Sequence, residues 1–235
     1  MKLVLKSSII FFDLIDKFIH QRKILNFFKK KQVEINYLID VGSHKGTYTD
    51  LFVKNFNIKK AYLFEPQEKI YKFLRKKYRN NKNIRIFNRA ISNKNIVKIL
   101  RLNHHDLTTT LSKFNKNNLY LKLKSLIFGV KDMTYESIRI KTVKLDQFFK
   151  KKTDKIDLLK IDTEGHELEV LFGLNNRINK VKFILIEFHN DKIYEKYDPI
   201  KIHNYLLKKN FKLETKFKFP FTTWEDRIYI NFNAL

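Results

Sequence analysis

The sequence has no cysteine, only three prolines and only five glycines. Without cysteine the chain can form no disulfide bond, thiolate nucleophile or cysteine-bound zinc site. This fits a reducing compartment, and we expect a cytoplasmic protein. Proline and glycine gather nowhere into a linker, so nothing divides the chain into several domains. Its 235 residues are 43% hydrophobic, enough for one normal core. We expect an N-terminal helical extension over residues 1–34 and one domain over residues 35–235.

The first 31 residues lack both a cleavage site of small residues and an uncharged apolar run long enough to cross a bilayer. They are therefore a poor match to a signal peptide or a membrane span. Their apolar residues instead recur at the spacing of an amphipathic helix with lysines on its other face. We expect this helix to pack on the domain, and peripheral contact with an anionic membrane is the alternative. The apolar positions are Leu14, Ile15, Phe18, Ile19, Leu25 and Phe28.

The charge balance is one-sided, with 49 Lys and Arg against 24 Asp and Glu and a formal net charge of +25. Such a charge favours nucleic-acid binding through phosphate contacts. However, 40 of the basic residues are Lys and nine are Arg, whereas planar recognition of phosphate and bases favours Arg. The basic residues are spread in short runs, and Lys, Asn, Ile and Phe all have AT-rich codons. Nucleic acid is therefore a less favoured partner than a small molecule.

From residue 35 onward, strand-like apolar runs alternate with segments of helical period, which predicts βαβ units and a mainly parallel, doubly wound sheet. Pro66 suits the first position of a helix. Two closing strands joined without a helix predict an antiparallel edge strand. We therefore expect a Rossmann-like α/β fold. The expected strands are residues 35–41, 60–65, 83–88, 97–102, 138–143, 156–161, 183–188, 211–217 and 227–232.

The first two expected strands both end in residues suited to a nucleoside. Gly42 follows the first strand and would let the backbone approach a ligand closely, although tight packing between helix and strand is the alternative. The second strand ends in Glu65, whose ionised carboxylate can accept hydrogen bonds from ribose hydroxyls. Asp40, Gly42 and Glu65 together predict a nucleoside-binding pocket. The amide of Asn88, after the third strand, is a candidate contact to the base.

The stretch over residues 156–171 is the strongest site candidate in the chain. A short apolar run ends in Asp162 and Glu164, and a helical pattern begins directly afterwards. Glu187 and His189 end the next expected strand in the same way. Because ligands bind beyond the carboxyl ends of the strands in open α/β sheets, we expect these four side chains to line one crevice.

Residues 35–232 resemble the FkbM-type S-adenosylmethionine-dependent methyltransferases. The most specific motif is Lys-Ile-Asp-Thr-Glu-Gly-His-Glu at residues 160–167, because its mixed acidic pattern is unusual among Rossmann-like domains. Ser43-His44 stands where the family more often has Ala-Asn. The resemblance implies a class I methyltransferase fold and transfer of a methyl group to a hydroxyl of a sugar, glycan, lipid or small natural product. The other motifs are residues 39–49, 64–66, 88–92, 143–146 and 186–189.

The same resemblance implies S-adenosyl-L-methionine as the cofactor and assigns residues to it. Glu65 would bind the ribose, Asn88 would lie near the adenine, and Asp162 would face the methionine end or the acceptor. The residues expected to bind the cofactor are Asp40, Gly42, Ser43, Glu65, Pro66, Asn88 and Asp162.

An alcohol acceptor has to lose a proton, so a nearby base helps the reaction. We rank His189 and Asp162 first as catalytic residues, followed by Glu164 and Glu187. We assign no metal ligand, and a divalent-metal site in this cluster is the alternative. The helix after Gly165 is expected to leave three polar side chains in solvent near its N-terminus: His166, Glu167 and Glu169.

The long polar stretch over residues 103–137 is expected to be a lid insertion, because loops of this length in compact domains are usually functional. His104, His105 and Thr109 would contact the acceptor, which we expect to be a small molecule or glycan. The alternative is surface decoration with a short helix near residues 119–126. An RNA methyltransferase and a non-catalytic Rossmann-like binding module are the competing functions, and the sequence predicts no oligomeric state.

Overall fold

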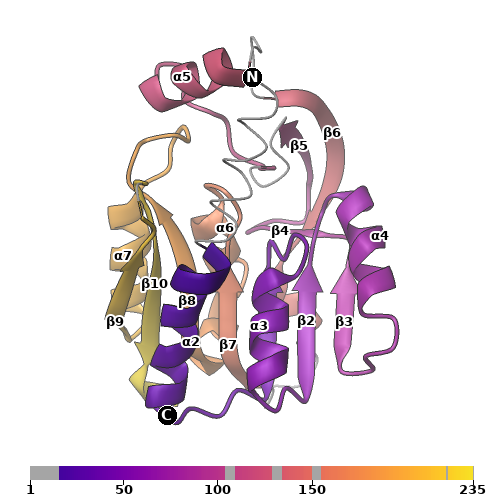
Figure 1. The fold of residues 1–235 in the computed structure, drawn as a ribbon, viewed down its shortest axis with the longest axis vertical. Coiled ribbons are helices and arrows are strands. Elements are labelled where there is room, and N and C mark those ends of the chain that lie inside the picture. The colour runs from indigo at the N-terminus through magenta and orange to yellow at the C-terminus, as the bar shows by residue number, and fades with distance from the viewer. Residues whose placement is uncertain (1–15, 104–108, 129–133, 150–154, 221, 235) are drawn as a thin grey trace.

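The computed structural model describes residues 16–103, 109–128, 134–149, 155–220 and 222–234. A seven-stranded central sheet has the order β3-β2-β1-β7-β8-β10-β9 (Figure 1). The strands β3, β2, β1, β7 and β8 pair in parallel, and β10 is antiparallel to both β8 and β9. The predicted mainly parallel sheet with antiparallel pairing at one end is confirmed. The strands are β1 (Tyr37–Val41), β2 (Lys60–Phe64), β3 (Ile84–Phe87), β7 (Ile156–Ile161), β8 (Val181–His189), β9 (Phe211–Lys218) and β10 (Trp224–Asn231).

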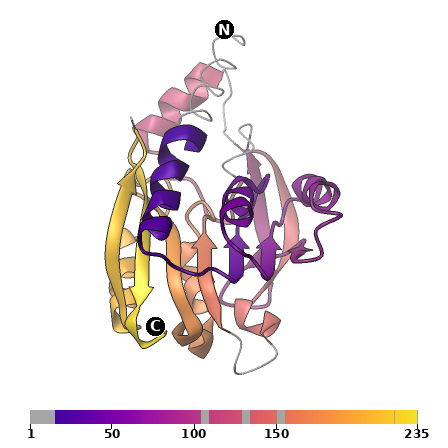
Figure 2. The ribbon, with the colours of Figure 1, turned by 60° about the horizontal axis from the view of Figure 1, so that its bottom comes forward.

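Helices cover both faces of the sheet, as Figures 1 and 2 show. Each face has its own hydrophobic core, because the strands in the middle of the sheet are apolar on both sides. One face is covered by α2 (Gln21–Lys30), α3 (Thr47–Asn55) and α4 (Glu68–Lys77). The other is covered by α6 (Glu167–Phe172), α7 (Pro199–Lys208), η3 (Leu145–Phe148) and η4 (Asn175–Lys180). Short turns η1 (Asp16–His20) and η5 (Phe232–Ala234) lie near the ends of the described chain.

The N-terminal helix α2 packs into the core of the first face. Ile24 and Phe28 are fully buried, and the Phe28 ring meets Phe52 and Phe183 edge-on at 5.6 and 5.5 Å. Phe18 in η1 remains 49% exposed. The apolar face expected for this segment is thus divided between the core and solvent. Within the described residues, no helix has both the length and the apolar character required to cross a bilayer.

A second, three-stranded sheet lies beside the central one and has the order β4-β6-β5. It contains β4 (Ala90–Ile91), β5 (Val97–Asn103) and β6 (Thr134–Val143). Both ends of the polar stretch at 103–137 therefore belong to strands, because backbone pairing continues beyond the apolar residues that marked them in the sequence. The helix α5 (Leu119–Phe128) lies between them and confirms the short helix considered for this region. In Figure 1 it sits above the carboxyl ends of the central strands.

The insertion is docked on the segment that follows β8. The N–H of Asn115 donates to the carbonyl of Ile193 at 2.8 Å, and the N–H of Glu195 donates to the carbonyl of Lys113 at 2.7 Å. The Phe114 and Tyr194 rings stack with centroids 5.4 Å apart. This places the insertion next to the end of β8.

The predicted helix start at Pro66 is wrong by two residues. Gln67 is extended (φ −74°, ψ 114°) and its N–H donates to the Glu65 carboxylate at 2.8 Å, so α4 begins at Glu68. Pro66 instead restricts the backbone between the end of β2 and the start of α4.

We expect Phe28→Ala to lower the free energy of unfolding by about 3–5 kcal/mol, because it empties a site enclosed by two other rings. Urea unfolding followed by circular dichroism measures the change. Phe73→Ala is the control: Phe73 lies on α4 and is 47% exposed, and its loss should cost no more than about 0.5 kcal/mol. Equal costs for the two variants would show that α2 is not part of the core.

Candidate active site

A row of charged side chains crosses the sheet just beyond the hydrophobic core under α2 and α3. Side chains two residues apart share one face of a strand, so each charged residue continues an apolar column. The strand pairing places Asp40 opposite Lys160 and Asp226 opposite Glu187, whereas Lys160 is opposite Leu185, so the row shifts by two residues between β7 and β8. The four pairs of core and charged residues are Leu38 and Asp40 on β1, Leu158 and Lys160 on β7, Leu185 and Glu187 on β8, and Ile228 and Asp226 on β10.

Lys160 is the buried cation of this row. Its Nζ lies 2.9 Å from Asp162 Oδ2, 3.9 Å from Asp40 Oδ1 and 4.5 Å from the centroid of the Tyr48 ring. Burial favours the neutral amine, but the two carboxylates outweigh it and raise the pKa of Lys160, so the ammonium stays charged. Burial likewise favours the neutral acid at Asp162, but Lys160 outweighs it and lowers the pKa of that carboxyl. Asp162 is therefore held as a carboxylate.

The turn after β1 ties three strand ends together. The N–H groups of Gly42 and Ser43 both donate to the Phe64 carbonyl, at 3.0 and 3.2 Å. Gly42 has φ +80°, and a Cβ there would lie 1.7 Å from the Asp162 carbonyl oxygen. The space in front of this glycine is thus filled by protein backbone, which favours the packing role over ligand approach. A cofactor contact by Gly42 stays a prediction.

Glu65 is buried at the end of β2, and its carboxylate accepts the N–H groups of His44 and Gln67 at 2.9 and 2.8 Å. Each oxygen retains a further lone pair for a ligand. Burial raises the pKa of Glu65 to about 7 against these two hydrogen bonds. The side-chain amide of Asn88 donates to the carbonyls of Glu65 and Pro66, at 3.1 Å each, and so holds the backbone that follows β2.

Two polar atoms at the end of β1 are suited to a bound polar molecule. Asp40 Oδ2 accepts the Thr49 hydroxyl at 2.6 Å, whereas Asp40 Oδ1 is buried without a hydrogen-bond partner. The Ser43 hydroxyl is also buried and without a partner. Native buried polar groups are nearly always satisfied, so an unsatisfied pair calls for a ligand or water. These atoms and Glu65 fit the polar groups of a nucleoside with a charged tail.

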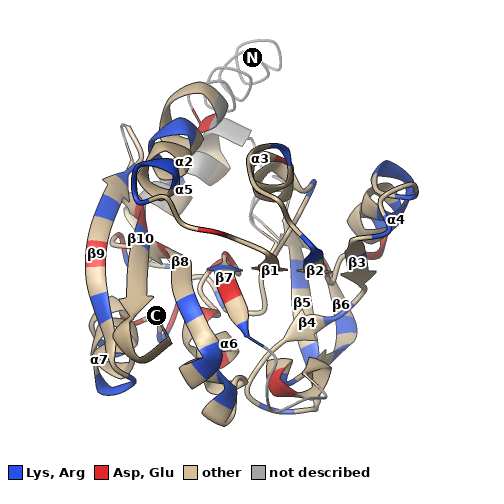
Figure 3. Ribbon diagram, turned by 90° about the horizontal axis from the view of Figure 1, so that it is seen from below, with Lys and Arg blue, Asp and Glu red and all other residues tan. Residues whose placement is uncertain are grey.

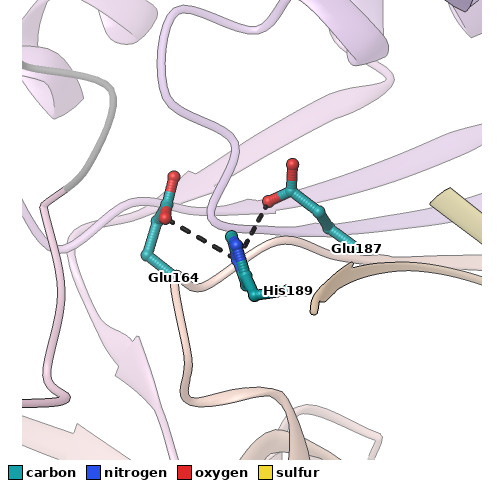
Figure 4. Close-up of side chains that lie close together, drawn as sticks. All are labelled: Glu164, Glu187 and His189. Carbon is teal, nitrogen blue, oxygen red and sulfur yellow. Dashed lines mark ion pairs between the residues drawn. The ribbon is translucent and has the colours of Figure 1, made fainter. Parts of the chain in front are cut away.

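Glu164, Glu187 and His189 converge (Figure 4), and Glu187 is hydrogen-bonded to Asp162. His189 Nε2 lies 3.5 Å from Glu187 Oε2 and 3.7 Å from Glu164 Oε2. Burial, and then the nearby Asp162 and Glu164, hold the pKa of Glu187 well above its usual value. Burial also lowers the pKa of His189, which favours the neutral imidazole. Tyr194 donates its hydroxyl to Glu164.

The expectation that His166 and Glu167 are solvated is wrong. Glu167 is fully buried, and its Oε1 accepts the N–H groups of Thr163 and Gly165, both at 3.0 Å. His166 is 5% exposed and its Nε2 lies 3.0 Å from the Ser92 hydroxyl. The reason is that the insertion and the second sheet cover this helix start. Burial raises the pKa of Glu167 to about 7 and lowers the pKa of His166 to about 3.

Sequence reasoning missed the contribution of the N-terminal segment. His20 Nε2 lies 2.8 Å from Asp226 Oδ2, which also accepts the Tyr48 hydroxyl at 2.7 Å. His20 and Asp226 are 206 residues apart. The alternation of core-facing residues along the last strand could have marked Asp226 as a buried acid. Nothing in the sequence indicated its partner.

The structure therefore brings most of the predicted site residues to one edge of the sheet. Thr109 directly precedes Thr110, whose hydroxyl donates to the Glu164 carbonyl at 2.5 Å. His104 and His105 lie outside the described residues. The residues that gather at the carboxyl ends of β1, β2, β7 and β8 are Asp40, Gly42, Ser43, Glu65, Pro66, Asp162, Glu164, Glu187 and His189.

A sequence model described as the methyltransferase FkbM domain matches residues 40–213. The chain belongs to the FkbM methyltransferase family. This confirms the family predicted from the motifs, and with it S-adenosylmethionine as the cofactor. The unpartnered atoms of Asp40 and Ser43 fit the polar groups of that molecule.

Two solved structures share the fold. The FkbM methyltransferase from Methylobacillus flagellatus superposes with a TM-score of 0.56 and 15% identity, over 83% of this chain and 43% of that chain. The Escherichia coli protein yhhF superposes with a TM-score of 0.50 and 11% identity, over 92% of this chain and 86% of that chain. The hexuronic acid methyltransferase AglP of Haloferax volcanii is 40% identical over 57 residues, 24% of either chain. The chain thus spans less than half of its FkbM structural relative and about a quarter of this curated relative.

We expect Glu65→Ala to weaken S-adenosylmethionine binding by about 1.5–3 kcal/mol, because it removes a charged acceptor of ribose hydroxyls. This corresponds to an increase in Kd of roughly tenfold to a hundredfold. Isothermal titration calorimetry measures the change. Glu68→Ala removes an acid three positions away that is 55% exposed on α4 and should leave the affinity unaltered. A wild-type Kd in Glu65→Ala would remove Glu65 from the pocket.

We also expect the affinity for S-adenosylmethionine to rise with pH up to about 7, because hydroxyl donors favour the ionised form of a carboxyl whose pKa is about 7. Linkage limits the slope to roughly tenfold per pH unit below that value. In the free protein, folding favours the protonated form of Glu65. The resulting contribution to stability is fully present below a pH of about 4.5, the ordinary pKa of the group, and it is lost as the pH rises through 7. Calorimetry between pH 5.5 and 8.5 tests the binding trend, and an unchanged slope in Glu65→Ala would assign the trend to another group.

Proposed function

We propose that this protein transfers a methyl group from S-adenosylmethionine to a hydroxyl of a sugar or glycan-like acceptor. The observation that carries the proposal is that Glu164, Glu187 and His189 cluster at the strand ends, with Glu187 hydrogen-bonded to Asp162. The family supports methyl transfer, and the partial similarity to a hexuronic acid methyltransferase supports a sugar acceptor.

The residues divide into a cofactor half and an acceptor half. Glu65 would hold the ribose hydroxyls of the cofactor, Asn88 would lie near its base, and Asp40 and Ser43 would hold other polar groups of the molecule. When bound, S-adenosylmethionine supplies an electrophilic methyl carbon on a sulfonium for in-line displacement. Much of the rate enhancement then comes from holding the acceptor oxygen in line with that carbon.

The acceptor half is rich in hydrogen-bond acceptors. Glu164, Glu187 and His189 offer atoms that all lie within 4.8 Å of one another, a spacing that suits the hydroxyl donors of a sugar. Asp162 and His189 are the two groups placed to receive the proton of the attacking hydroxyl. Asp162 is held as a carboxylate by Lys160, 2.9 Å away.

The insertion completes the acceptor side as a lid. Thr110 and Ser112 donate their hydroxyls to the carbonyls of Glu164 and Gly165, at 2.5 and 2.6 Å. These contacts of the neighbouring residues support the assignment of Thr109 to acceptor binding, and the assignment of His104 and His105 stays a prediction. Peripheral membrane contact through the N-terminal segment stays a separate prediction.

The basic surface gives no specific support for an RNA substrate. Figure 3 shows Lys and Arg on many elements, among them β9, α4, β5 and β6. The carboxylates of Asp162 and Glu164 in the candidate site would repel a phosphate backbone.

Incubation with radiolabelled S-adenosylmethionine and a panel of uronic acids, neutral sugars, glycans, lipids and RNA tests the proposal. We expect label on a sugar or glycan, and a reduction of about 100-fold to 10,000-fold in Asp162→Asn, because the variant loses its ionised proton acceptor. Glu68→Gln should retain wild-type activity. Label on RNA alone would favour the nucleic-acid function, and cofactor binding without transfer to any class would favour a non-catalytic module.

A further inference from the structure

We propose that Glu164, Glu187 and His189 bind a divalent cation that holds the acceptor hydroxyl for methyl transfer. The cation site itself stands on the geometry of these three residues. Its role toward the acceptor rests on the proposed function. The proposal replaces the expectation, drawn from the sequence, that this cluster acts without a metal.

The spacing of the three side chains suits metal ligands better than hydrogen bonds. His189 Nε2 is 3.5 Å from Glu187 Oε2 and 3.7 Å from Glu164 Oε2, whereas an N–H···O hydrogen bond has a separation near 2.9 Å. Two ligand atoms that are each about 2.1 Å from one ion lie about 3.0–3.4 Å apart, depending on the coordination angle. A shift of a few tenths of an ångström would bring the histidine nitrogen and either carboxylate oxygen to such a separation, and all three atoms lie within 4.8 Å of one another.

His189 supplies the observation that points to a ligand. The residue is 6% exposed, and its Nε2 is buried with no hydrogen-bond partner. Figure 4 shows this nitrogen directed between the two carboxylates. A buried imidazole nitrogen without a hydrogen bond is rare, and a metal ion would satisfy it.

Surrounding groups hold the three ligands in place, as they do at known metal sites. The Tyr194 and Tyr197 rings meet the His189 ring nearly edge-on, at 5.0 and 5.7 Å. Tyr194 also donates its hydroxyl to Glu164, and Glu187 is hydrogen-bonded to Asp162. The ligands are thus fixed before any ion arrives.

The charge balance favours a cation at the same place. Glu187 stands in the sheet between Asp162 and Asp226, and Glu164 lies beside it. Lys160, the buried cation of the charged row, lies against Asp162 and Asp40. A divalent cation would offset the negative charge that these two carboxylates carry when ionised.

Two carboxylates and one imidazole suit Mn²⁺ or a similar first-row ion, and three protein ligands leave coordination positions open. Neighbouring oxygens of a sugar can occupy these positions.

The ion lowers the pKa of the coordinated hydroxyl, whose proton passes to Asp162. The acceptor oxygen then forms a bond to the methyl carbon while the carbon–sulfur bond breaks and its electron pair remains on sulfur. With His189 coordinated, Asp162 is the proton acceptor.

Titration of the full-length, chelator-treated protein with Mn²⁺, followed by electron paramagnetic resonance of the free ion, tests the site without any acceptor. We expect one bound Mn²⁺ and an affinity at least about tenfold lower in His189→Ala and in Glu187→Gln. Glu169→Gln is the control, because the Glu169 side chain on α6 is more exposed than those of Glu164 and Glu187. This variant should bind Mn²⁺ as tightly as the wild type does. Circular dichroism verifies that each variant is folded. No binding by the wild type, or equal binding by folded His189→Ala, would overturn the site.

Chelation should also abolish methyl transfer, and added Mn²⁺ should restore it, while calorimetry finds S-adenosylmethionine binding unchanged by the chelator. Full transfer after chelation would overturn the role of the ion. Absence of transfer to every acceptor with Mn²⁺ present would contradict the proposed function, whereas the Mn²⁺ titration would still decide the metal site.

Discussion

The buried ammonium of Lys160 is the interaction on which the site depends. It lies between the carboxylates of Asp40 and Asp162, which stand at the ends of two adjacent parallel strands. Buried carboxylates without a counter-charge are strongly unfavourable, and a paired ammonium offsets much of that cost. Removal of the amine would leave the acids Asp40 and Asp162 without their shared counter-charge. The residue that sets the charge of the site is thus also the one that stabilises the edge of the sheet.

Around this pair, the geometry of parallel strands brings the two halves of the site together. Residues at equivalent positions of adjacent strands lie side by side, so Asp162, directly after β7, is next to Glu187 on β8. The backbone at Gly42 packs closely against the Asp162 carbonyl. The ends of β1, β7 and β8 are thus held together.

Most strands and acids were predictable because both arise from local patterns. Buried parallel strands are continuous apolar runs. A charged residue directly after such a run therefore lies at the carboxyl end of the strand, where ligands bind in open α/β sheets. The burial of His166 and Glu167 was not predictable, because it depends on an insertion whose docking surface follows β8. The same holds for His20 and Asp226, since contacts between distant segments leave no periodic trace in the sequence.

The pairing of His20 with Asp226 has a consequence for where the folding unit ends. The span shared with the family, residues 40–213, begins within β1 and stops within β9. It omits both α2 and β10, although β10 pairs with β8 along seven residues. A fragment cut to that span would expose the edge of β8 and the apolar surface under Phe28, an arrangement prone to aggregation. The span that matches the family model and the segment that forms the packed sheet are therefore different parts of this chain.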